Sequence, residues 1–467
     1  MPRISLAFLM SVSLTNAVAA QAAVVVEPSL RSSFHTIDNP SGQAQAHFGG
    51  STVILDYDAD GVPDLAVGAP GEDADRGAVY VYLGPDLATF IRLESLDRAA
   101  GDLFGSFLNT AHLDAHPGDD LMIGAERKQE SGMPAAGAMY LVSHAGTTIK
   151  LSAPVHQLNA YFGCSAQSGD FTLDGEMELA IGARSASAAG GGPGAGVLYF
   201  FKQNSPGVWT YQFELACPDQ VPGAGQSEFA GFGAHTAVLE DAAGNTMGIF
   251  ATRIGAVVAP EPGRGAVDFI RVPMGPGATP MQTFLNPIAS EDQDGNYRWG
   301  MHLAVQSIGS TGFDVSIGHN RQDRLRSDGT YAQTAGSATH FRVVLNTVVS
   351  VATKGTADDG IEFVQADHYG FRTQWVDLVG GPERELVNLA LGTAPITKPR
   401  IYIYASGNLT GAPFVVPLPD GASHHAGNGM SSGQLFTASR KKELVLGDPF
   451  FGTGASNIGR VLIFEAR

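Results

Sequence analysis

The amino-acid sequence predicts an all-β fold, a seven-bladed β-propeller in which an N-terminal strand completes the last blade (a 3+1 closure). Three observations lead to this prediction. An aromatic–glycine pair recurs every 56 to 70 residues along the chain. Each pair is followed by short apolar runs bounded by Gly, Pro or Asp, which is the pattern of strands. The composition, with 59 glycines in 467 residues and 16% charged residues, is typical of an all-β chain with many turns.

The repeat is clearest in its two anchors. The aromatic–glycine pairs are Phe48-Gly49, Phe104-Gly105, Phe162-Gly163, Phe232-Gly233, Trp299-Gly300, Tyr369-Gly370 and a degenerate His425-Ala426-Gly427. A second glycine follows at a similar distance, as Gly68, Gly124, Gly182, Gly318, Gly392 and Gly447, and Thr252 replaces it in the fourth copy. Because glycine lets backbones approach closely, we expect the anchors where strands crowd near a common axis.

Each copy holds up to four apolar runs. In the first copy they are Thr52–Leu55, Leu65–Pro70, Gly77–Tyr82 and Phe90–Leu93. Four strands in each of seven copies match a propeller. Neighbouring blades would cover both faces of each sheet, which explains why the runs are continuous and not alternating.

The two ends of the chain are predicted to share one blade. The seventh copy stops after its third strand, whereas residues Ser33 to Gly49 match Thr89 to Gly105 in length and in the closing Phe-Gly. We therefore expect Ser33–Ile37 to form the outer strand of blade 7 and to remove an exposed edge. One propeller domain then spans 33–467, after a short lead at 23–32.

The first 22 residues have the features of a secretory signal peptide. Arg3 gives a positive start, Ile4 to Leu14 is mostly apolar, and Ala20-Gln21-Ala22 is a small-x-small cleavage site. No later stretch approaches the ~18 apolar residues of a membrane helix. The sequence predicts an exported protein, extracellular or periplasmic, without a membrane span.

The chain has two cysteines, Cys164 and Cys217. An oxidising compartment permits a bridge between them. Their expected places, on the first strand and after the fourth strand of one blade, are too far apart for a bridge unless the connecting loop turns inward at once. Two small buried hydrophobic side chains are therefore favoured.

The loop after the first predicted strand carries alternating carboxylates. Asp56, Asp58, Asp60 and Asp64 surround a bend at Gly61, and the Val62 carbonyl can add another oxygen. Ca²⁺ takes six to eight oxygen ligands in a flexible cage. Carboxylates this close repel one another without a cation. The pattern favours a structural Ca²⁺ over a solvated acidic hairpin, and the cage leaves no open position for a substrate.

The third copy repeats this frame with a weaker ligand set, Asp170, Thr172, Asp174 and Glu178, and its occupancy stays open. The second copy has His112, Asp114, His116 and Asp120 at the same positions. Histidine suits transition metals better than Ca²⁺, and the bend glycine is missing. We interpret the second copy as a lost site.

The Phe48-Gly49 anchor, the Asp56–Asp64 loop and Val67-Gly68-Ala69-Pro70 resemble the FG-GAP repeat. The resemblance extends, with weakening copies, over about 33–467. It implies the seven-bladed propeller of integrin α chains, Ca²⁺ between strands 1 and 2, and a ligand face made by the 2–3 and 4–1 loops. The leg domains, membrane helix and cytoplasmic tail of integrins have no counterpart in the sequence.

The charge and the motifs narrow the function. A net charge of −18 argues against nucleic-acid binding. The sequence holds no Gly-x-Ser-x-Gly elbow, His-Glu-x-x-His motif or phosphate-binding loop, so we assign no catalytic residue. The favoured function is a non-enzymatic binding or adhesion scaffold for a protein or glycan ligand. The alternatives are a lectin-like module, or a polysaccharide hydrolase or lyase with acids at the central channel.

Overall fold

The computed structural model describes residues 32–114, 116–188, 194–218, 231–254, 265–287, 299–309, 311–355, 367–378, 384–392, 398–405, 411–423, 426–436, 442–452 and 456–466. The predicted signal peptide, residues 1–22, lies outside them, as does His425 of the degenerate anchor.

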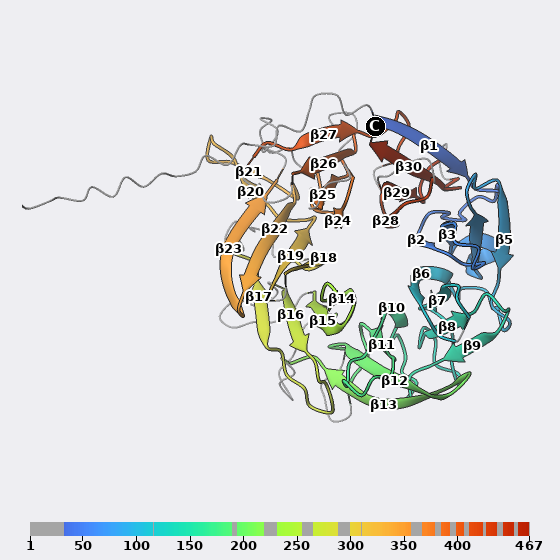
Figure 1. The fold of residues 1–467 in the computed structure, drawn as a ribbon. Helices are drawn as coiled ribbons and strands as arrows, with labels where there is room; N and C mark the ends of the chain where they lie inside the picture. The colour runs from blue at the N-terminus through green and yellow to red at the C-terminus, as the bar shows by residue number, and fades with distance from the viewer. Residues whose placement is uncertain are drawn as a thin grey trace, which may run out of the picture.

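The fold is a seven-bladed β-propeller, as predicted. Seven antiparallel four-stranded sheets are arranged around a common axis (Figure 1). From the innermost strand outward, the blades are β2 (Thr52–Leu55), β3 (Asp64–Ala69), β4 (Ala78–Leu83) and β5 (Thr89–Leu93); β6 (Phe104–Ala111), β7 (Asp120–Ala125), β8 (Ala138–Val142) and β9 (Thr148–Leu151); β10 (Phe162–Gly169), β11 (Glu178–Ala183), β12 (Val197–Ser205) and β13 (Val208–Ala216); β14 (Thr236–Glu240), β15 (Thr246–Arg253), β16 (Ala266–Arg271) and β17 (Gln282–Leu285); β18 (His302–Ile308), β19 (Gly312–His319), β22 (Ser337–Val344) and β23 (Thr347–Lys354); β24 (Arg372–Val376), β25 (Glu385–Ala390), β26 (Arg400–Tyr404) and β27 (Phe414–Pro417); and β28 (Met430–Gly433), β29 (Glu443–Asp448), β30 (Arg460–Ala466) and β1 (Ser32–Asp38).

The N-terminal strand closes the ring. β1 pairs antiparallel with β30, from Ser32 opposite Ala466 to Asp38 opposite Arg460. Phe34 packs on Phe464 with ring centroids 5.4 Å apart. The prediction for Ser33–Ile37 is therefore confirmed, and the strand begins one residue earlier, at the last position of the predicted lead.

The core consists of layers between blades. The second strands β3, β7, β11, β25 and β29 are buried at every residue, as expected for sheets covered on both faces. The buried apolar side chains of the described residues form seven clusters, and each cluster joins two neighbouring sheets. Each blade is thus stabilised by its neighbours, which favours a closed ring.

The aromatic–glycine pairs join each blade to the one before it. The aromatic side chains are at most 1% exposed, and each following glycine has a positive φ, for example 91° at Gly49 and 87° at Gly105. Phe104 forms a parallel bridge with Gly77 of blade 1, and Phe48 forms the same bridge with Gly459 of blade 7. The repeat unit is therefore also the unit of blade packing.

The second anchor glycine has a steric role. A Cβ at Gly68 would overlap the carbonyl oxygen of Gly105 in the next blade, and Gly447 meets Gly49 in the same way. In blade 6, Gly392 lies beyond the second strand, and the prediction that it is the anchor is wrong. Leu389 occupies the anchor position in blade 6. It is the fifth residue of β25, as Gly68 is the fifth residue of β3, and its carbonyl accepts a hydrogen bond from the Phe371 amide at 3.2 Å.

Smaller features complete the described chain. The helix α1 (Glu72–Asp75) is a single turn, and within the described residues no helix has the length and hydropathy to cross a membrane. The hairpin β20 (Arg324–Leu325) and β21 (Tyr331–Ala332) lies in the connection from β19 to β22. Both cysteines are free thiols, and Cys217 packs in the apolar layer between blades 3 and 4.

Candidate metal centre and central channel

The loop between β2 and β3 brings three of the predicted ligands together. One carboxylate oxygen each of Asp56, Asp58 and Asp60 lies within 4.8 Å of the other two. The Gly61 amide donates to Asp56 Oδ2 at 3.0 Å, the Asp60 amide to Asp58 Oδ1 at 3.3 Å, and the Val62 amide to Asp60 Oδ1 at 2.7 Å. Each carboxylate thus keeps one oxygen that these backbone bonds leave available for an ion.

Asp56 gives the clearest sign that the loop accommodates a cation. Its Oδ1 atom is buried and has no hydrogen-bond partner in the described part of the chain. A buried carboxylate oxygen without a partner is costly, and a bound cation would remove that cost. The donor set, carboxylates with a nearby main-chain carbonyl, fits Ca²⁺.

Asp64 lies apart from the three converging carboxylates. It is 1% exposed, and its two oxygens accept from the amides of Tyr57 and Gly84, each at 2.8 Å. Burial raises its pKa, and these hydrogen bonds oppose that rise. The expectation that Asp64 and the Val62 carbonyl complete the cage stays a prediction.

The same carboxylate position recurs as a hairpin clamp. In four other blades, the first residue of the second strand accepts from a loop amide at 2.6 to 2.8 Å: Leu113 to Asp120, Phe171 to Glu178, Leu378 to Glu385 and Leu435 to Glu443. This residue therefore stabilises the loop between strands 1 and 2 in blades with and without further acids.

The second predicted site is also assembled. Oxygens of Asp170, Asp174 and Glu178 lie within 4.8 Å of one another. The Thr172 hydroxyl donates to Glu178 Oε1 at 2.9 Å, so it is engaged within the loop.

A lysine supplies the positive charge at this second site. Nζ of Lys202 donates to Asp174, lies 3.1 Å from Glu176 Oε2 and 4.0 Å from Glu178 Oε1. Lys202 pairs with Glu178 across β11 and β12. Continuing the register of β3 and β4 by one residue places Leu83 at the same position in blade 1. The acidic loop of blade 3 therefore has a lysine ammonium group beside its carboxylates, whereas the equivalent position beside the loop of blade 1 holds an uncharged leucine.

In the loop of blade 2, the residues that the structure describes form no such cluster of acids. His116 Nδ1 lies 3.1 Å from Asp114 Oδ1, and His112 Nε2 lies 3.5 Å from Asp119 Oδ1. Asp119 instead binds the neighbouring loop, since its Oδ2 accepts from the Asp56 amide at 2.9 Å. The interpretation of this loop as a lost site stays a prediction.

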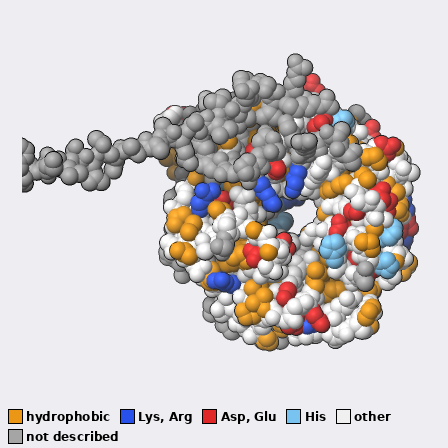
Figure 2. Space-filling model, in the orientation of Figure 1, with side chains coloured by type: hydrophobic (Ala, Val, Ile, Leu, Met, Phe, Trp, Pro, Cys, Tyr) orange, Lys and Arg blue, Asp and Glu red, His pale blue; other side chains and the backbone are white. Residues whose placement is uncertain are grey.

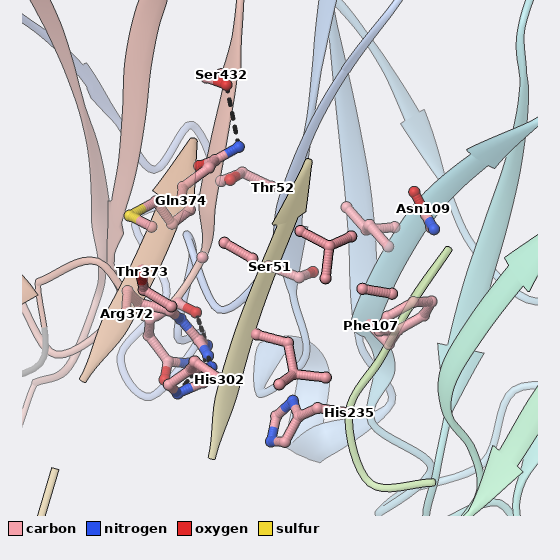
Figure 3. A pocket seen from close by; sticks show the side chains of 18 of the residues that line it. Ser51, Thr52, Phe107, Asn109, His235, His302, Arg372, Thr373, Gln374 and Ser432 are labelled. Atoms are coloured by element: carbon pink, nitrogen blue, oxygen red, sulfur yellow. Dashed lines mark hydrogen bonds between the residues drawn. The ribbon is translucent and has the colours of Figure 1, made fainter. Parts of the chain in front are cut away.

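A channel of about 610 Å³ lies along the propeller axis and is lined by the first strand of every blade (Figure 3). Its wall carries hydroxyl and amide groups such as those of Thr52, Asn109 and Gln374, and Gln374 donates to Ser432 at 3.0 Å. The only charged side chains in the lining are Arg372, Arg384 and Lys442; no Asp or Glu lines it among the described residues.

Three basic side chains occupy one level of the channel. His235, His302 and Arg372 each stand two residues after an anchor glycine, at equivalent register positions in blades 4, 5 and 6. The two imidazole rings lie 4.9 Å apart, and Nη1 of Arg372 lies 2.6 Å from Nε2 of His302.

Burial governs the charge at this level. It lowers the pKa of His235 to about 3 and that of His302 well below the usual value, with the Arg372 charge adding to both shifts. Both imidazoles are therefore neutral at pH 7. Burial also lowers the pKa of Arg372 to about 9, which still leaves the guanidinium charged at pH 7.

Sequence reasoning missed this basic level because its members lie about 70 residues apart. The signal that finds them is positional. The residue two after each anchor glycine is Ser51, Phe107, Ser165, His235, His302, Arg372 and Gly429 in turn. For the hydrolase or lyase alternative, the described lining offers His235 and His302 but no Asp or Glu.

Comparison with known proteins identifies the repeat. Residues 48–82 match the FG-GAP repeat, so the resemblance is confirmed for blade 1. The chain is distantly similar to phosphatidylinositol-glycan-specific phospholipase D of Homo sapiens, with 34% identity over 90 residues, which is 18% of this chain and 11% of that protein. It is also similar to integrin α-5 of Xenopus laevis, with 27% identity over 176 residues, 36% of this chain and 16% of that one. Integrin α-11 of Homo sapiens is 32% identical over 157 residues, 30% of this chain and 13% of that one.

The chain thus spans less than a fifth of the length of these relatives. One relative carries the name of a phospholipase and two carry the names of integrin α chains. What they share with this chain is a limited stretch, so their activities and partners are not transferred with it.

Proposed function

We propose that this FG-GAP propeller is an exported, calcium-stabilised scaffold that binds a macromolecular ligand without catalysis, through the face made by its 2–3 and 4–1 loops. Export rests on the signal-peptide pattern of residues 1–22. The observation that carries the choice of face is the distribution of exposed apolar side chains over the loops.

Within the described ranges of the chain, seven of the large apolar side chains that are exposed lie in 2–3 or 4–1 connections: Leu96, Met133, Val155, Leu158, Leu325, Tyr331 and Phe450. Four lie in 1–2 or 3–4 connections, namely Leu173, Met177, Met281 and Leu345. Exposed apolar side chains on loops held by a rigid scaffold are typical of a recognition surface.

Blade 2 shows how such a surface is built. Met133 lies in the connection from β7 to β8, residues 126–137. Val155 and Leu158 lie in the connection from β9 to β10. The Asn159 amide donates to the Pro134 carbonyl at 3.0 Å, so the two loops support each other. Val155 is 66% exposed and Leu158 59% exposed.

The binding test compares the two faces. A double variant, Val155→Glu and Leu158→Glu, should abolish capture of the ligand in a pull-down with the chain from residue 23 onward. Leu345→Glu is the matched control, because Leu345 is 71% exposed on the opposite face and should tolerate the charge. Equal loss in both variants, or loss in the control alone, would contradict the choice of face.

Two further assays separate the alternatives. A glycan array identifies a lectin-like module, and a depolymerisation assay on acidic and neutral polysaccharides identifies a hydrolase or lyase. Turnover that persists in a purified chain would overturn the non-enzymatic assignment.

The calcium component has its own test. Thermal unfolding should shift upward in Ca²⁺ relative to chelator, because a ligand that binds only the folded state stabilises it, by about 2.7 kcal/mol at 100 times Kd. Asp58→Ala should remove the shift. Asp114→Ala is the matched control, since Asp114 holds the same place in the loop of blade 2. Identical curves with Ca²⁺ and chelator would exclude a stabilising ion.

A further inference from the structure

We propose that the central channel is a binding site for a small ligand that carries an oxyanion group, a carboxylate, phosphate or sulfate, with Arg372 as its principal contact. This site is separate from the loop face and does not depend on its function. The first support is the sign of the charge. The chain has 46 acidic and 28 basic residues, yet the charged side chains in the channel lining are Arg372, Arg384 and Lys442.

Arg372 differs from four other arginines in the described strands. Arg253, Arg342, Arg400 and Arg460 each meet a carboxylate, those of Asp268, Asp314, Asp367 and Asp448, at 2.6 to 3.4 Å. Arg372 instead donates to the carbonyls of Gly427, at 3.1 Å, and Asn428, and contacts His302. Its hydrogen bonds are made to neutral groups, and no described carboxylate lies within ion-pair distance of it.

A half-buried charge such as that of Arg372, which meets only neutral partners among the described residues, is costly to the folded state. The lowered pKa of Arg372 reflects this cost, since burial disfavours the charged form. An oxyanion in the channel would provide the missing counter-charge, and a planar guanidinium binds such groups with two parallel hydrogen bonds. The protein thus retains this charge without an acidic partner among the described residues, in a channel that a small ligand can reach.

The neighbours of Arg372 are suited to the same ligand. His235 and His302 are neutral by burial, so each offers an N–H donor without a competing negative charge. Figure 3 shows these imidazoles beside Arg372 on the channel wall. Ser51 and Thr373 are already engaged, with the Gly105 carbonyl and Ser316 respectively, and serve to fix the wall.

The opposite end of the channel is also positive. Arg384 and Lys442 directly precede β25 and β29, at the ends of their 1–2 loops, whereas Arg372 begins β24. Five residue steps along β24, at ~3.3 Å each, separate the level of Arg372 from that of Arg384 by roughly 17 Å. Figure 2 shows Lys and Arg side chains at the edge of the central opening. A ligand with one anionic group would contact Arg372, and the distal pair would attract it into the channel.

The experiment uses calorimetry and thermal unfolding in calcium-free buffer with chloride at constant ionic strength. The probes are inorganic phosphate, sulfate and glucuronate, with glucose as the uncharged comparator of glucuronate. At least one oxyanion should bind at one site per chain and raise the melting temperature, whereas glucose should do neither. Which of the three binds tightest distinguishes a phosphate or sulfate ligand from an acidic sugar.

Arg372→Gln should weaken binding by roughly tenfold or more, as expected for a lost charge-assisted pair. Arg460→Gln is the matched control, because it removes a sheet arginine outside the channel and should retain the anion response. If Arg372→Gln does not fold, the double variant Arg384→Gln and Lys442→Gln replaces it and should weaken binding several-fold. Failure of all three oxyanions to bind more tightly than chloride would overturn the proposal, as would unchanged affinity in the channel variants.

Discussion

One register position distinguishes the two acidic loops. In blade 3 it holds Lys202, whose ammonium group contacts Asp174 and Glu176. In blade 1 it holds Leu83, so the acids of that loop have no built-in cation there. Close carboxylates require a positive charge nearby. The protein meets this requirement with lysine in one blade and, as we propose, with Ca²⁺ in the other.

The first prediction is that Lys202→Leu makes the loop of blade 3 dependent on calcium. In an Asp58→Ala background, which lacks the first site, Lys202→Leu should lower the melting temperature in chelator and restore an upward shift of a few degrees in Ca²⁺. Thermal unfolding with and without Ca²⁺ checks this. If the melting temperature of the Asp58→Ala, Lys202→Leu protein is the same with and without Ca²⁺, the loop of blade 3 does not hold the ion.

The carboxylates of the first loop were predictable from the sequence because they lie within five residues. Lys202 was not, because it is 28 residues from Asp174 and is brought there by the pairing of β11 with β12. The clamp made by Asp64 was also hidden, since a carboxylate that accepts backbone amides and one that binds a metal look alike in sequence.

Buried histidine gives a second prediction, on pH. His340 is 3% exposed, both its ring nitrogens lack a hydrogen-bond partner in the described chain, and burial lowers its pKa to about 3. As pH falls below ~6.5, the unfolded chain gains a proton that the folded chain does not, so stability falls. The loss attributable to His340 is about 2 kcal/mol between pH 7 and pH 5.

His340→Leu should therefore make the decline in unfolding free energy between pH 7 and pH 5 shallower by about that amount. Denaturant unfolding at several pH values measures it. His112→Leu is the control, since its side chain is 64% exposed. Parallel stability curves for the wild type and His340→Leu would mean that the pKa of His340 is the same in the folded and the unfolded chain, contrary to the prediction.

At the scale of elements, the anchors explain both the success and the failure of the strand prediction. Where the glycine pair is complete, as at Gly49 and Gly68, the strand bounds predicted from the sequence lie within one residue of those in the structure. Blade 6 departs because Leu389 stands at the second anchor, and its side chain packs against Gly427 of blade 7. At this anchor the neighbouring blades are in contact through a leucine side chain, whereas at Gly68 they are in contact through backbone atoms. The spacing of glycines in the sequence does not reveal this difference.

The third prediction tests the second anchor. In Gly68→Ala, the new methyl group would overlap the Gly105 carbonyl and Ser51 Oγ, so blades 1 and 2 must move apart. We expect a loss of about 1–3 kcal/mol in unfolding free energy, the usual cost of overpacking. Denaturant unfolding measures the difference.

Gly275→Ala is the control for this change. A Cβ at Gly275 would have no heavy atom within 4 Å, and its φ is not positive. It should leave stability within about 0.5 kcal/mol of the wild type. Equal effects at Gly68 and Gly275 would contradict the close approach of neighbouring blades at this anchor.

At the scale of the whole molecule, the closing of the ring of blades determines how the apolar layers are covered. Seven apolar layers each need two sheets, and the layer between blades 6 and 7 includes Phe34 of β1 at its margin. The sequence predicted this closure because Ser33–Gly49 repeats the spacing of Thr89–Gly105. The channel could not be predicted in the same way, because each blade contributes only a few residues to it and they form no linear motif.

The central claim is a closed ring sealed by its own N-terminal strand, and truncation tests it most directly. Two chains, beginning at residue 32 and at residue 39, differ only by β1. Without β1 the edge of β30 is exposed, which favours unfolding and association between chains. We predict that the chain from residue 32 unfolds at the temperature of the full chain, and that the chain from residue 39 unfolds several degrees lower. Equal melting temperatures for the two truncated chains would contradict the account.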